Sequence, residues 1–200
     1  MIVHGPRPKG RIRPEQLPAY EKTGNWIIQR KYNGHKNTIY ISGDQVDFYN
    51  KGAKFLRYKM PEKLRKQFAA LNLKGKCWLD GELLHPTVKD TVVLYDALQL
   101  DGKYLIGKTQ IERLNLLSEV CVNPQQLCSS GVALQVSDNI WLAEWWDKDF
   151  ACHFEEFLDL DLIEGLVLRR KKGRLMNMGH LPYETDDQIR CRKNSKKYRF

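Results

Sequence analysis

Three short apolar stretches in the first quarter of the chain are separated by two sequences that form tight turns. Residues 26–31, 36–41 and 46–50 are rich in β-branched and aromatic side chains, as strands usually are. Asn33-Gly34 separates the first two stretches, and Ser42-Gly43-Asp44-Gln45 separates the second and third. Connections this short cannot contain the crossover that a parallel pair of strands requires. The sequence therefore predicts an antiparallel β-sheet.

Helices and further strands are expected in the rest of the chain. Residues 61–70 begin with proline, which is well tolerated in the first turn of a helix. Thr109-Gln110-Ile111-Glu112 is a capping-box pattern that opens a second helix, whose apolar stripe is expected in the core. A third helix is expected over residues 141–160. Further strands are expected at residues 77–84, 91–98, 132–136, 163–170 and 188–193. These elements predict an α+β fold of antiparallel sheets with packed helices, forming one domain over residues 21–200.

The first 20 residues are basic and rich in proline. Prolines and cations alternate there, at Pro6, Arg7, Pro8, Lys9, Arg11, Arg13, Pro14 and Pro18. Because proline disfavours helices and central strands, we expect residues 1–20 to form an extended arm on the surface. Contact with a nucleic-acid backbone and a plain solvated leader are both compatible with this pattern.

The charge of the chain favours a polyanionic partner. The 200 residues carry a formal net charge of +9, with a pI near 9.3. Cations that neutralise phosphates release condensed counterions, which favours binding to nucleic acid, although ordinary solubility is an alternative explanation. No apolar run approaches the roughly 20 residues of a membrane span, so no membrane partner is expected. The five cysteines form no metal-type spacing, and their odd number without a signal peptide favours a reducing, cytoplasmic setting.

Lys31 is the clearest candidate for a catalytic residue. It lies at the end of the apolar run that begins at Trp26 and immediately before the Asn33-Gly34 turn. A lysine held at a strand end can be aimed into a cleft, where removal from water and nearby cations make its amine a nucleophile. A solvated surface lysine is the alternative, because most lysines are exposed.

Four later segments each place a charged or aromatic residue on a strand-like run. They are Leu79-Asp80-Gly81-Glu82-Leu83, Val92-Val93-Leu94-Tyr95-Asp96, Ile163-Glu164-Gly165-Leu166-Val167-Leu168-Arg169 and Ile189-Arg190-Cys191-Arg192-Lys193. With Lys31-Tyr32-Asn33-Gly34 they resemble, in order, the signature segments of the covalent nucleotidyltransferases, which include ATP-dependent DNA ligases, RNA ligases and mRNA capping enzymes. The resemblance runs from about Trp26 to the C-terminus and is closest to the adenylation domain of DNA ligases. It implies the ATP-grasp-like nucleotidyltransferase fold. The family pattern Lys-x-Asp-Gly has Asn33 in the Asp position here.

The resemblance implies a ligase reaction in three steps. The amine of Lys31 attacks the α-phosphorus of ATP, AMP then passes to a 5′-phosphate, and a 3′-hydroxyl finally displaces AMP and seals the strand. The ribose contact is implied for Glu82, purine stacking for Tyr95, and binding of Mg²⁺ (or Mn²⁺) for Glu164 and Asp80. Further nucleotide contacts are implied for Gln29, Lys36, Lys51, Glu164, Arg169, Arg190, Arg192 and Lys193.

Two basic segments depart from the family pattern. Arg169 stands where the family usually has lysine, and a guanidinium cannot lose its proton as an amine can. In the last segment, the two-residue period of a strand places Arg190 and Arg192 on one face. A register that directs Lys193 inward is the alternative, and we favour the arginine pair.

The sequence leaves the substrate and the partners open. Family ligases continue into an OB-fold after the last segment, whereas this chain ends at Phe200. We therefore expect a minimal monomeric ligase, a fragment, or a separate protein that supplies the OB-fold function, with the basic arm and residues 196–199 as candidate phosphate contacts. Nicked duplex DNA is favoured over RNA, with roles in DNA repair or replication and a viral origin as expectations. The alternatives are an RNA ligase, a capping-type guanylyltransferase and an inactive nucleic-acid-binding homologue.

Overall fold

The computed structural model describes residues 2–84, 88–121, 125–126, 131–176 and 183–194. Cys128 and the basic residues 196–199 lie outside these ranges. Within them the chain forms two β-sheets with short helices, which confirms the predicted α+β class with mainly antiparallel strands. None of the helices described has both the length and the apolar character needed to cross a membrane.

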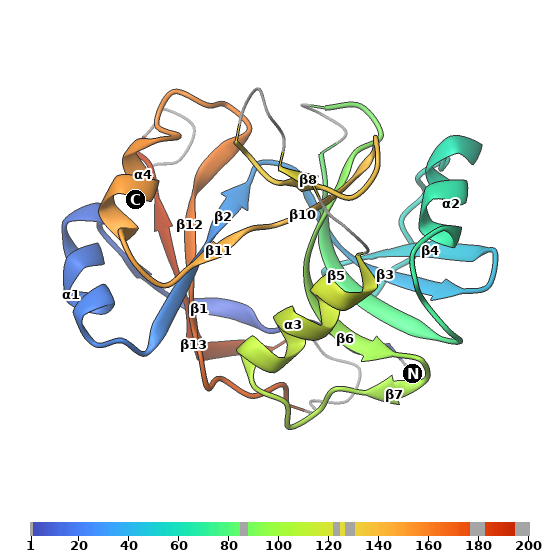
Figure 1. Ribbon diagram of the computed structural model, residues 1–200, viewed down its shortest axis with the longest axis horizontal. Coiled ribbons are helices and arrows are strands. Elements are labelled where there is room, and N and C mark those ends of the chain that lie inside the picture. Colours follow the sequence, from blue (N-terminus) through green and yellow to red (C-terminus); the bar gives the residue numbers. More distant parts are fainter. Residues whose placement is uncertain (1, 85–87, 122–124, 127–130, 177–182, 195–200) are drawn as a thin grey trace.

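The first sheet contains five strands and is antiparallel except at one edge. Its order is β1-β13-β12-β2-β11, and only β1 and β13 run parallel in it. The strands are β1 (Arg7–Ile12), β13 (Glu184–Arg192), β12 (Ile163–Arg170), β2 (Trp26–Tyr32) and β11 (Trp145–Trp146). The short helices α1 (Leu17–Lys22) and α4 (Phe150–Glu155) lie beside this sheet, and η1 (Pro14–Gln16) precedes α1 (Figure 1).

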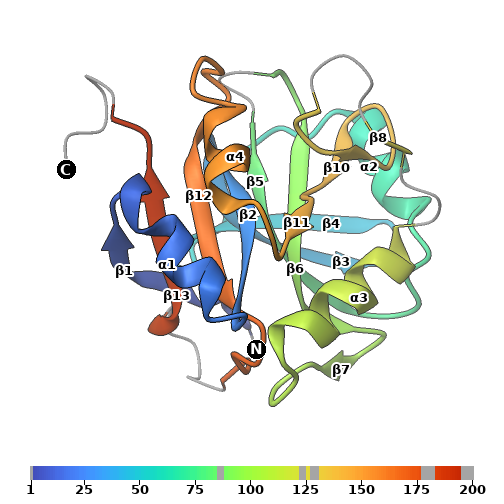
Figure 2. The same cartoon turned by 60° about the vertical axis from the view of Figure 1, so that its left-hand side comes forward.

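The second sheet is larger and carries the other two helices. Its order is β4-β3-β5-β6-β10-β9-β8, with β7 paired to β6. The strands are β3 (His35–Ser42), β4 (Gln45–Asn50), β5 (Cys77–Leu83), β6 (Val92–Leu100), β7 (Lys103–Tyr104), β8 (Gln125–Gln126), β9 (Leu134–Gln135) and β10 (Ile140–Leu142). The helices are α2 (Glu62–Ala69) and α3 (Gln110–Val120), which agree with the two predicted from proline and the capping box. Figure 2 shows the two sheets as separate layers with β2 and β12 facing β5 and β6.

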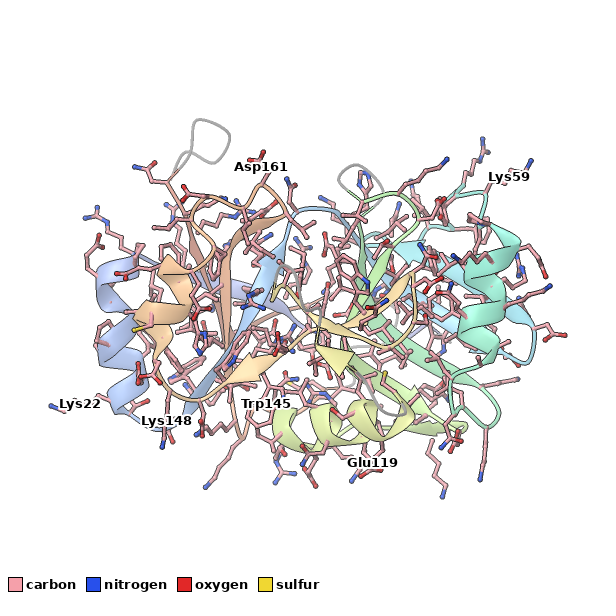
Figure 3. All side chains as sticks on the ribbon, turned by 45° about the horizontal axis from the view of Figure 1, so that its top comes forward. Lys22, Lys59, Glu119, Trp145, Lys148 and Asp161 are labelled. Atoms are coloured by element: carbon pink, nitrogen blue, oxygen red, sulfur yellow. The ribbon has the colours of Figure 1, made fainter. Side chains whose placement is uncertain are left out.

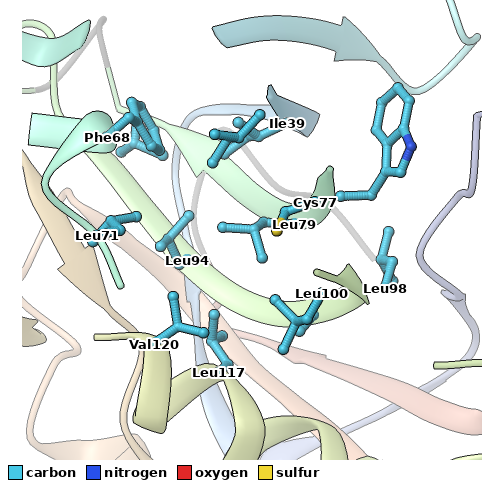
Figure 4. Packing of buried hydrophobic residues seen from close by; sticks show 14 of the residues in the cluster. Ile39, Phe68, Leu71, Cys77, Leu79, Leu94, Leu98, Leu100, Leu117 and Val120 are labelled. Carbon is cyan, nitrogen blue, oxygen red and sulfur yellow. The ribbon is translucent and has the colours of Figure 1, made fainter. Parts of the chain in front are cut away.

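The buried hydrophobic residues form two clusters, the second of which also contains Val93 of β6 and Trp141 of β10. In the second sheet, Ile39, Leu79 and Leu94 are fully buried and pack with Phe68 of α2 and Leu117 of α3 (Figure 4). A second cluster joins the first sheet to α1 and α4, with these buried members among others: Ile28, Leu166, Leu168, Ile189, Cys191, Leu17, Phe150 and Phe154. Burial of a side chain of this size stabilises the fold by about 1.5–3 kcal/mol. The faces of the sheets that turn away from these cores are therefore free to form a site.

The turn after Lys31 does not close a hairpin. β2 pairs with β12 and β11, whereas β3 pairs with β4 and β5, so residues 33–34 carry the chain from one sheet to the other. Asn33 is held by the loop before β12, because its backbone N–H donates to the Leu162 carbonyl at 2.8 Å and its side-chain amide donates to the Asp161 carbonyl at 3.2 Å. An aspartate has no N–H to donate to that carbonyl. Gly34 lies against β5, where a Cβ atom would come within 2.6 Å of the Leu83 carbonyl oxygen.

The helix predicted over residues 141–160 is wrong. This stretch contains the end of β10, then β11, and only six helical residues in α4. Asp149, before α4, has a left-handed backbone with φ of 57°, which a continuous helix cannot contain. The aromatic residues are partly used by β11, which extends the first sheet beside β2. The strand expected at residues 132–136 is likewise reduced to Leu134–Gln135.

The expected arm at residues 1–20 needs correction as well. Residues 7–12 are extended, but as β1 at the edge of the first sheet, and residues 17–22 form a helix. Proline is tolerated in a strand at a sheet edge, where one of its sides makes no ladder hydrogen bonds. The N-terminal segment is therefore part of the packed domain.

Candidate active site

A pocket lies between the two sheets and brings together residues from both. From the first sheet it is lined by Gln29, Lys31 and Arg169, and from the second by Lys36, Glu82 and Tyr95. These six residues were all predicted from the sequence as nucleotide contacts. The structure therefore collects side chains that are as many as 140 positions apart, from Gln29 to Arg169, around one cavity.

Strand alternation explains how the first sheet supplies its part. On β2, Ile28 belongs to the core beside the helices, whereas Gln29 and Lys31 line the pocket on the other face. On β12, Leu166 and Leu168 are buried in the same core, and Arg169 lines the pocket. Successive side chains along each strand point to opposite faces of the sheet. The apolar residues bury one face of the sheet in the core, so Lys31 and Arg169 lie on the opposite face, toward the pocket.

The amine of Lys31 forms an ion pair with the carboxylate of Glu164. Arg192 reaches the same carboxylate oxygen, with Nη2 3.4 Å away, and the Glu164 residue is only 8% exposed. Two cations therefore offset the cost of burying this carboxylate, which would be several kcal/mol for an unpaired charge. The Glu164 carboxylate thus lies between the Lys31 amine and the Arg192 guanidinium, beside the pocket.

Gly165 makes this arrangement possible. Its φ of 152° is rare for other residues, and a Cβ atom there would overlap the backbone of Cys191 on the neighbouring strand. The register of β12 on β2 also shifts between Ile163 and Gly165. This irregularity turns Glu164 toward Lys31, which a regular strand would not do.

Glu82 and Lys36 are cross-strand neighbours on β5 and β3. Burial raises the pKa of Glu82 to about 7, against the opposing effects of Lys31 and Lys36. Burial also raises the pKa of Asp80, although Lys36 opposes the shift through a 2.9 Å ion pair. A half-protonated carboxyl at Glu82 can exchange hydrogen bonds with a ligand hydroxyl near neutral pH.

The ring of Tyr95 lies between Glu82 and two cations. Its hydroxyl donates to a Glu82 carboxylate oxygen at 3.4 Å, and burial raises its pKa, which keeps the phenol protonated. The Lys36 amine and the Arg169 guanidinium lie over the ring, 5.5 Å and 5.3 Å from its centroid. Only Lys36 can move aside easily, because Arg169 is 4% exposed and held by other side chains.

A buried polar network beneath Tyr95 was not predicted. The carboxylate of Asp96 receives two hydrogen bonds from Arg113 of α3, at 2.9 and 2.8 Å, and one from Gln110 at 3.2 Å. Arg169 approaches Asp96 at 3.5 Å and the Gln110 side-chain oxygen at 3.3 Å. Asp96 and Arg113 are 0% and 1% exposed. The network anchors Arg169 under the pocket and joins α3 to β6.

The N-terminal segment forms one wall of the pocket, which the sequence did not reveal. Pro8 lines the cavity, and Gly5 lies so close to the Asp80 carboxylate that a Cβ atom would overlap it. In the amide orientation that satisfies both of its polar atoms, Gln188 donates to the Pro6 carbonyl at 3.1 Å and accepts from Arg169 at 2.9 Å. The parallel pairing of β1 with β13 holds this segment in place.

Five predicted nucleotide contacts lie outside the pocket lining: Glu164 and Arg192, which pair with each other beside Lys31, and Lys51, Arg190 and Lys193. Lys51 is exposed in the turn after β4. Arg190 shares the face of β13 with Arg192, because Cys191 between them is fully buried in the core. Lys193 is only 9% exposed, and its amine donates to the carbonyls of Leu158 and Leu160 at 3.1 and 2.7 Å. Lys193 therefore fixes the loop before β12, and the geometry favours the arginine register.

Comparison with known proteins finds solved structures that are similar to this chain. No protein-family model and no curated protein sequence matches it. The ligase domain of LigD from M. tuberculosis is similar over 94% of this chain and 60% of its own, with 16% identity and a TM-score of 0.66. A mycobacterial DNA ligase D complexed with ATP and MES matches over 96% of this chain and 58% of its own, with 15% identity and a TM-score of 0.59.

A third solved structure, from a study of Lig E DNA ligases, matches 96% of this chain and 70% of its own at 15% identity, with a TM-score of 0.56. The chain thus spans about 60% of the length of the first two structures. At these identities the likeness shows the fold, which is that of the nucleotidyltransferase domain of DNA ligases. The fold that the sequence resemblance implied is confirmed.

Proposed function

We propose that the protein is an ATP-dependent polynucleotide ligase that joins 5′-phosphate and 3′-hydroxyl ends of nicked DNA through a lysyl-AMP intermediate. The observation that carries the proposal is the amine of Lys31, held at the rim of a pocket by the buried carboxylate of Glu164. Glu82 and Tyr95 face it from the second sheet. The fold shared with DNA ligase domains, one of them complexed with ATP, supports this assignment.

The residues around Lys31 match the demands of the first step. The amine must lose a proton before it attacks, and the carboxylate of Glu164, already bonded to it, is the nearest acceptor. A nitrogen–phosphorus bond then forms to the α-phosphate while the bond to pyrophosphate breaks. Arg192, 3.4 Å from Glu164, is placed to stabilise the negative charge of the transferring phosphate.

The second sheet is suited to hold the nucleoside. Glu82 accepts hydroxyl hydrogen bonds, which favours a ribose contact. A purine can stack on Tyr95 when Lys36 swings aside toward the phosphates, since the Lys36 side chain is 28% exposed whereas Arg169 stays fixed. Arg169 then supports the ring from below as a fixed cation and does not act as a mobile phosphate ligand.

One of the two carboxylates predicted as metal ligands suits a divalent metal ion. Mg²⁺ or Mn²⁺ is usually held by one or two carboxylates together with substrate phosphates, and it neutralises the phosphate charge. Glu164 and Glu82 are the carboxylates near Lys31, and burial raises the pKa of Glu82 to about 7, so a cation bound beside it would favour its charged form. Asp80 does not suit the ligand role predicted for it. It is completely buried, bonded to Lys36 and covered by Gly5, so no hydrated ion has access.

Gln29 favours adenine over guanine. Its side chain is 2% exposed and lines the pocket, and its amide nitrogen donates to the Tyr95 carbonyl at 3.5 Å. Its Oε1 atom has no partner among the described residues. Because the Tyr95 carbonyl holds the nitrogen, the oxygen is left as an acceptor for a ligand in the pocket. It can accept from the 6-amino group of adenine, whereas guanine presents an oxygen at that position.

The first test is covalent labelling of the protein. With Mg²⁺ and ATP labelled at the α-phosphate, we expect an adduct that survives a denaturing gel. Adding a nicked DNA duplex with a 5′-phosphate should discharge the label to the DNA, and a 5′-hydroxyl nick should not. Labelling by GTP alone would indicate a capping-type enzyme, and discharge only by nicked RNA would indicate an RNA ligase. DNA binding without any label would show an inactive homologue.

Replacing Gln29 tests the nucleotide preference. Gln29→Leu keeps the approximate size but removes the acceptor, so the rate of adduct formation with ATP should fall about tenfold or more, since a buried polar group left without its partner costs about 1–3 kcal/mol. The rate with GTP should change little, so the ratio of the two rates is the measurement. Gln99→Leu is the matched control, because Gln99 is 5% exposed and donates to a carbonyl outside the pocket. Equal losses with both nucleotides would contradict a base-reading role.

The remaining predictions extend this proposal. A separate protein with the OB-fold function, a monomeric state, a role in repair or replication and a viral origin stay predictions. The four described cysteines are free, which is compatible with the expected reducing, cytoplasmic setting.

A further inference from the structure

A second groove lies at the rim of the larger sheet, close to the crossover that follows Lys31. Its polar lining comes from His35, Arg57, Lys59 and Lys89, with Tyr58 and Leu83 between them. The groove has a volume of about 560 Å³. None of these residues belongs to the nucleotide pocket, so the proposed chemistry of Lys31 does not account for their arrangement.

The cations of this groove are not neutralised. Arg57, Lys59 and Lys89 are exposed, and none has an acidic partner within ion-pair distance in the described part of the chain. The one carboxylate in the lining, Asp90, is bonded to the Tyr58 hydroxyl at 2.5 Å. Some other surface lysines are paired, as Lys63 is with Asp138 at 2.7 Å. The groove therefore presents an uncompensated positive field.

The groove adjoins the nucleotide pocket through two strands. His35 pairs with Leu83, and the next pair along the same strands is Lys36 with Glu82, which line the nucleotide pocket. In Figure 3, Lys59 and Asp161 lie along the same edge of the molecule, and the Asp161 carbonyl binds Asn33 beside Lys31. A ligand in the groove thus lies one residue pair along β3 and β5 from Lys36 and Glu82, which line the nucleotide pocket.

We propose that this groove binds the phosphate backbone of the nicked DNA substrate and directs its 5′-phosphate end toward Lys31. The inference rests on the proposed ligase function and adds the surface that the substrate occupies. Three exposed cations on one groove suit a chain of phosphates, which binds through counterion release and without base contacts. The covalent attachment of AMP to Lys31 does not require the groove.

The test compares two pairs of lysines with equal charge. Lys59→Ala/Lys89→Ala removes two cations of the groove. Lys74→Ala/Lys103→Ala removes two exposed lysines that line a separate hollow near β7 and α3, and serves as the matched control. Binding of a fluorescent nicked DNA duplex is measured by anisotropy over a range of salt concentrations, with a nicked RNA duplex as competitor. Labelling by ATP is measured for every variant.

The groove variant should bind the nicked DNA about tenfold or more weakly, and the slope of log affinity against log salt should fall by about 2, near 0.9 for each lost phosphate contact. The control variant should bind almost as the wild type does, and both should label with ATP at the wild-type rate. Equal weakening in the two variants, or none in the groove variant, overturns the groove assignment. Stronger competition by RNA than by unlabelled DNA overturns the choice of DNA. Wild-type protein that labels with ATP but binds no DNA overturns the groove and leaves the adenylation chemistry standing, whereas DNA binding without labelling overturns the ligase proposal.

Discussion

Lys31→Ala is expected to abolish the covalent nucleotide adduct completely while the fold survives. The alanine removes the only amine paired with Glu164 in the described structure, and no other lysine lies at that carboxylate. Glu164 keeps Arg192 as a partner, so no unpaired buried charge is created. The measurement is labelling with α-labelled ATP, alongside thermal unfolding to verify the fold.

Two further variants distinguish the role of Lys31 as a nucleophile from the role of positive charge in the pocket. Lys31→Arg keeps a cation beside Glu164 but cannot lose its proton, so it should give no adduct either. Lys36→Ala removes a cation from the same pocket and keeps the nucleophile, so its adduct should form more slowly but remain detectable. Label on the Lys31→Ala protein would show that another group carries the nucleotide, and the proposed mechanism would then be wrong.

Sequence patterns were most informative where a strand carries both core and site residues. Lys31 and Arg169 were predicted as site residues from the family resemblance, and the alternation on β2 and β12 explains why both leave the core on the pocket side. The two helices with N-terminal signals, at Pro61 and Thr109, were also predicted correctly because capping is a local property. Local chemistry and local periodicity are visible in a single sequence.

The sequence did not reveal which strands that are distant in the chain pair with one another. Asn33-Gly34 has the sequence of a hairpin turn, yet Leu162 and Leu83, which hold the two residues, are remote in the chain. The aromatic-rich stretch at residues 141–160 is apolar enough for a helix. In the structure, however, Trp145–Trp146 form strand β11, which pairs with β2. Tertiary contacts override local preference in both cases.

The buried network was missed for a similar reason. Arg113 lies on the inner face of a helix whose sequence suggests an ordinary apolar stripe, and Asp96 lies inside a strand-like run. A buried charge is only tolerable with a partner, but the sequence does not say which of the many cations that partner is. The position of Arg169, and with it one wall of the pocket, depends on that pair.

Arg113→Leu is expected to lower the free energy of unfolding by about 3–5 kcal/mol, which is typical of breaking a buried ion pair from one side. The leucine leaves Asp96 fully buried, with the Ala97 backbone N–H at 2.9 Å and longer contacts to Gln110 and Arg169 at 3.2 and 3.5 Å. Urea unfolding monitored by tryptophan fluorescence measures the loss. Lys63→Leu is the surface control, because its ion pair with Asp138 is two-thirds exposed and should contribute little to the free energy of unfolding.

The pH dependence identifies the cause of this loss. Burial tends to raise the pKa of Asp96, but the neighbouring Arg113 outweighs burial and holds the pKa below its usual value. In the wild type the pair therefore stabilises the fold above the usual aspartate pKa, and this stabilisation is lost as the pH falls through the lowered value.

In Arg113→Leu the burial effect dominates and the Asp96 pKa rises, so the variant should approach the wild type in stability as the pH falls and the carboxyl protonates. The double variant Arg113→Leu/Asp96→Asn removes the unpaired charge and keeps an acceptor for Arg169, so it should be more stable than Arg113→Leu at neutral pH. A loss that is independent of pH and persists in the double variant would assign the role of Arg113 to packing rather than to charge.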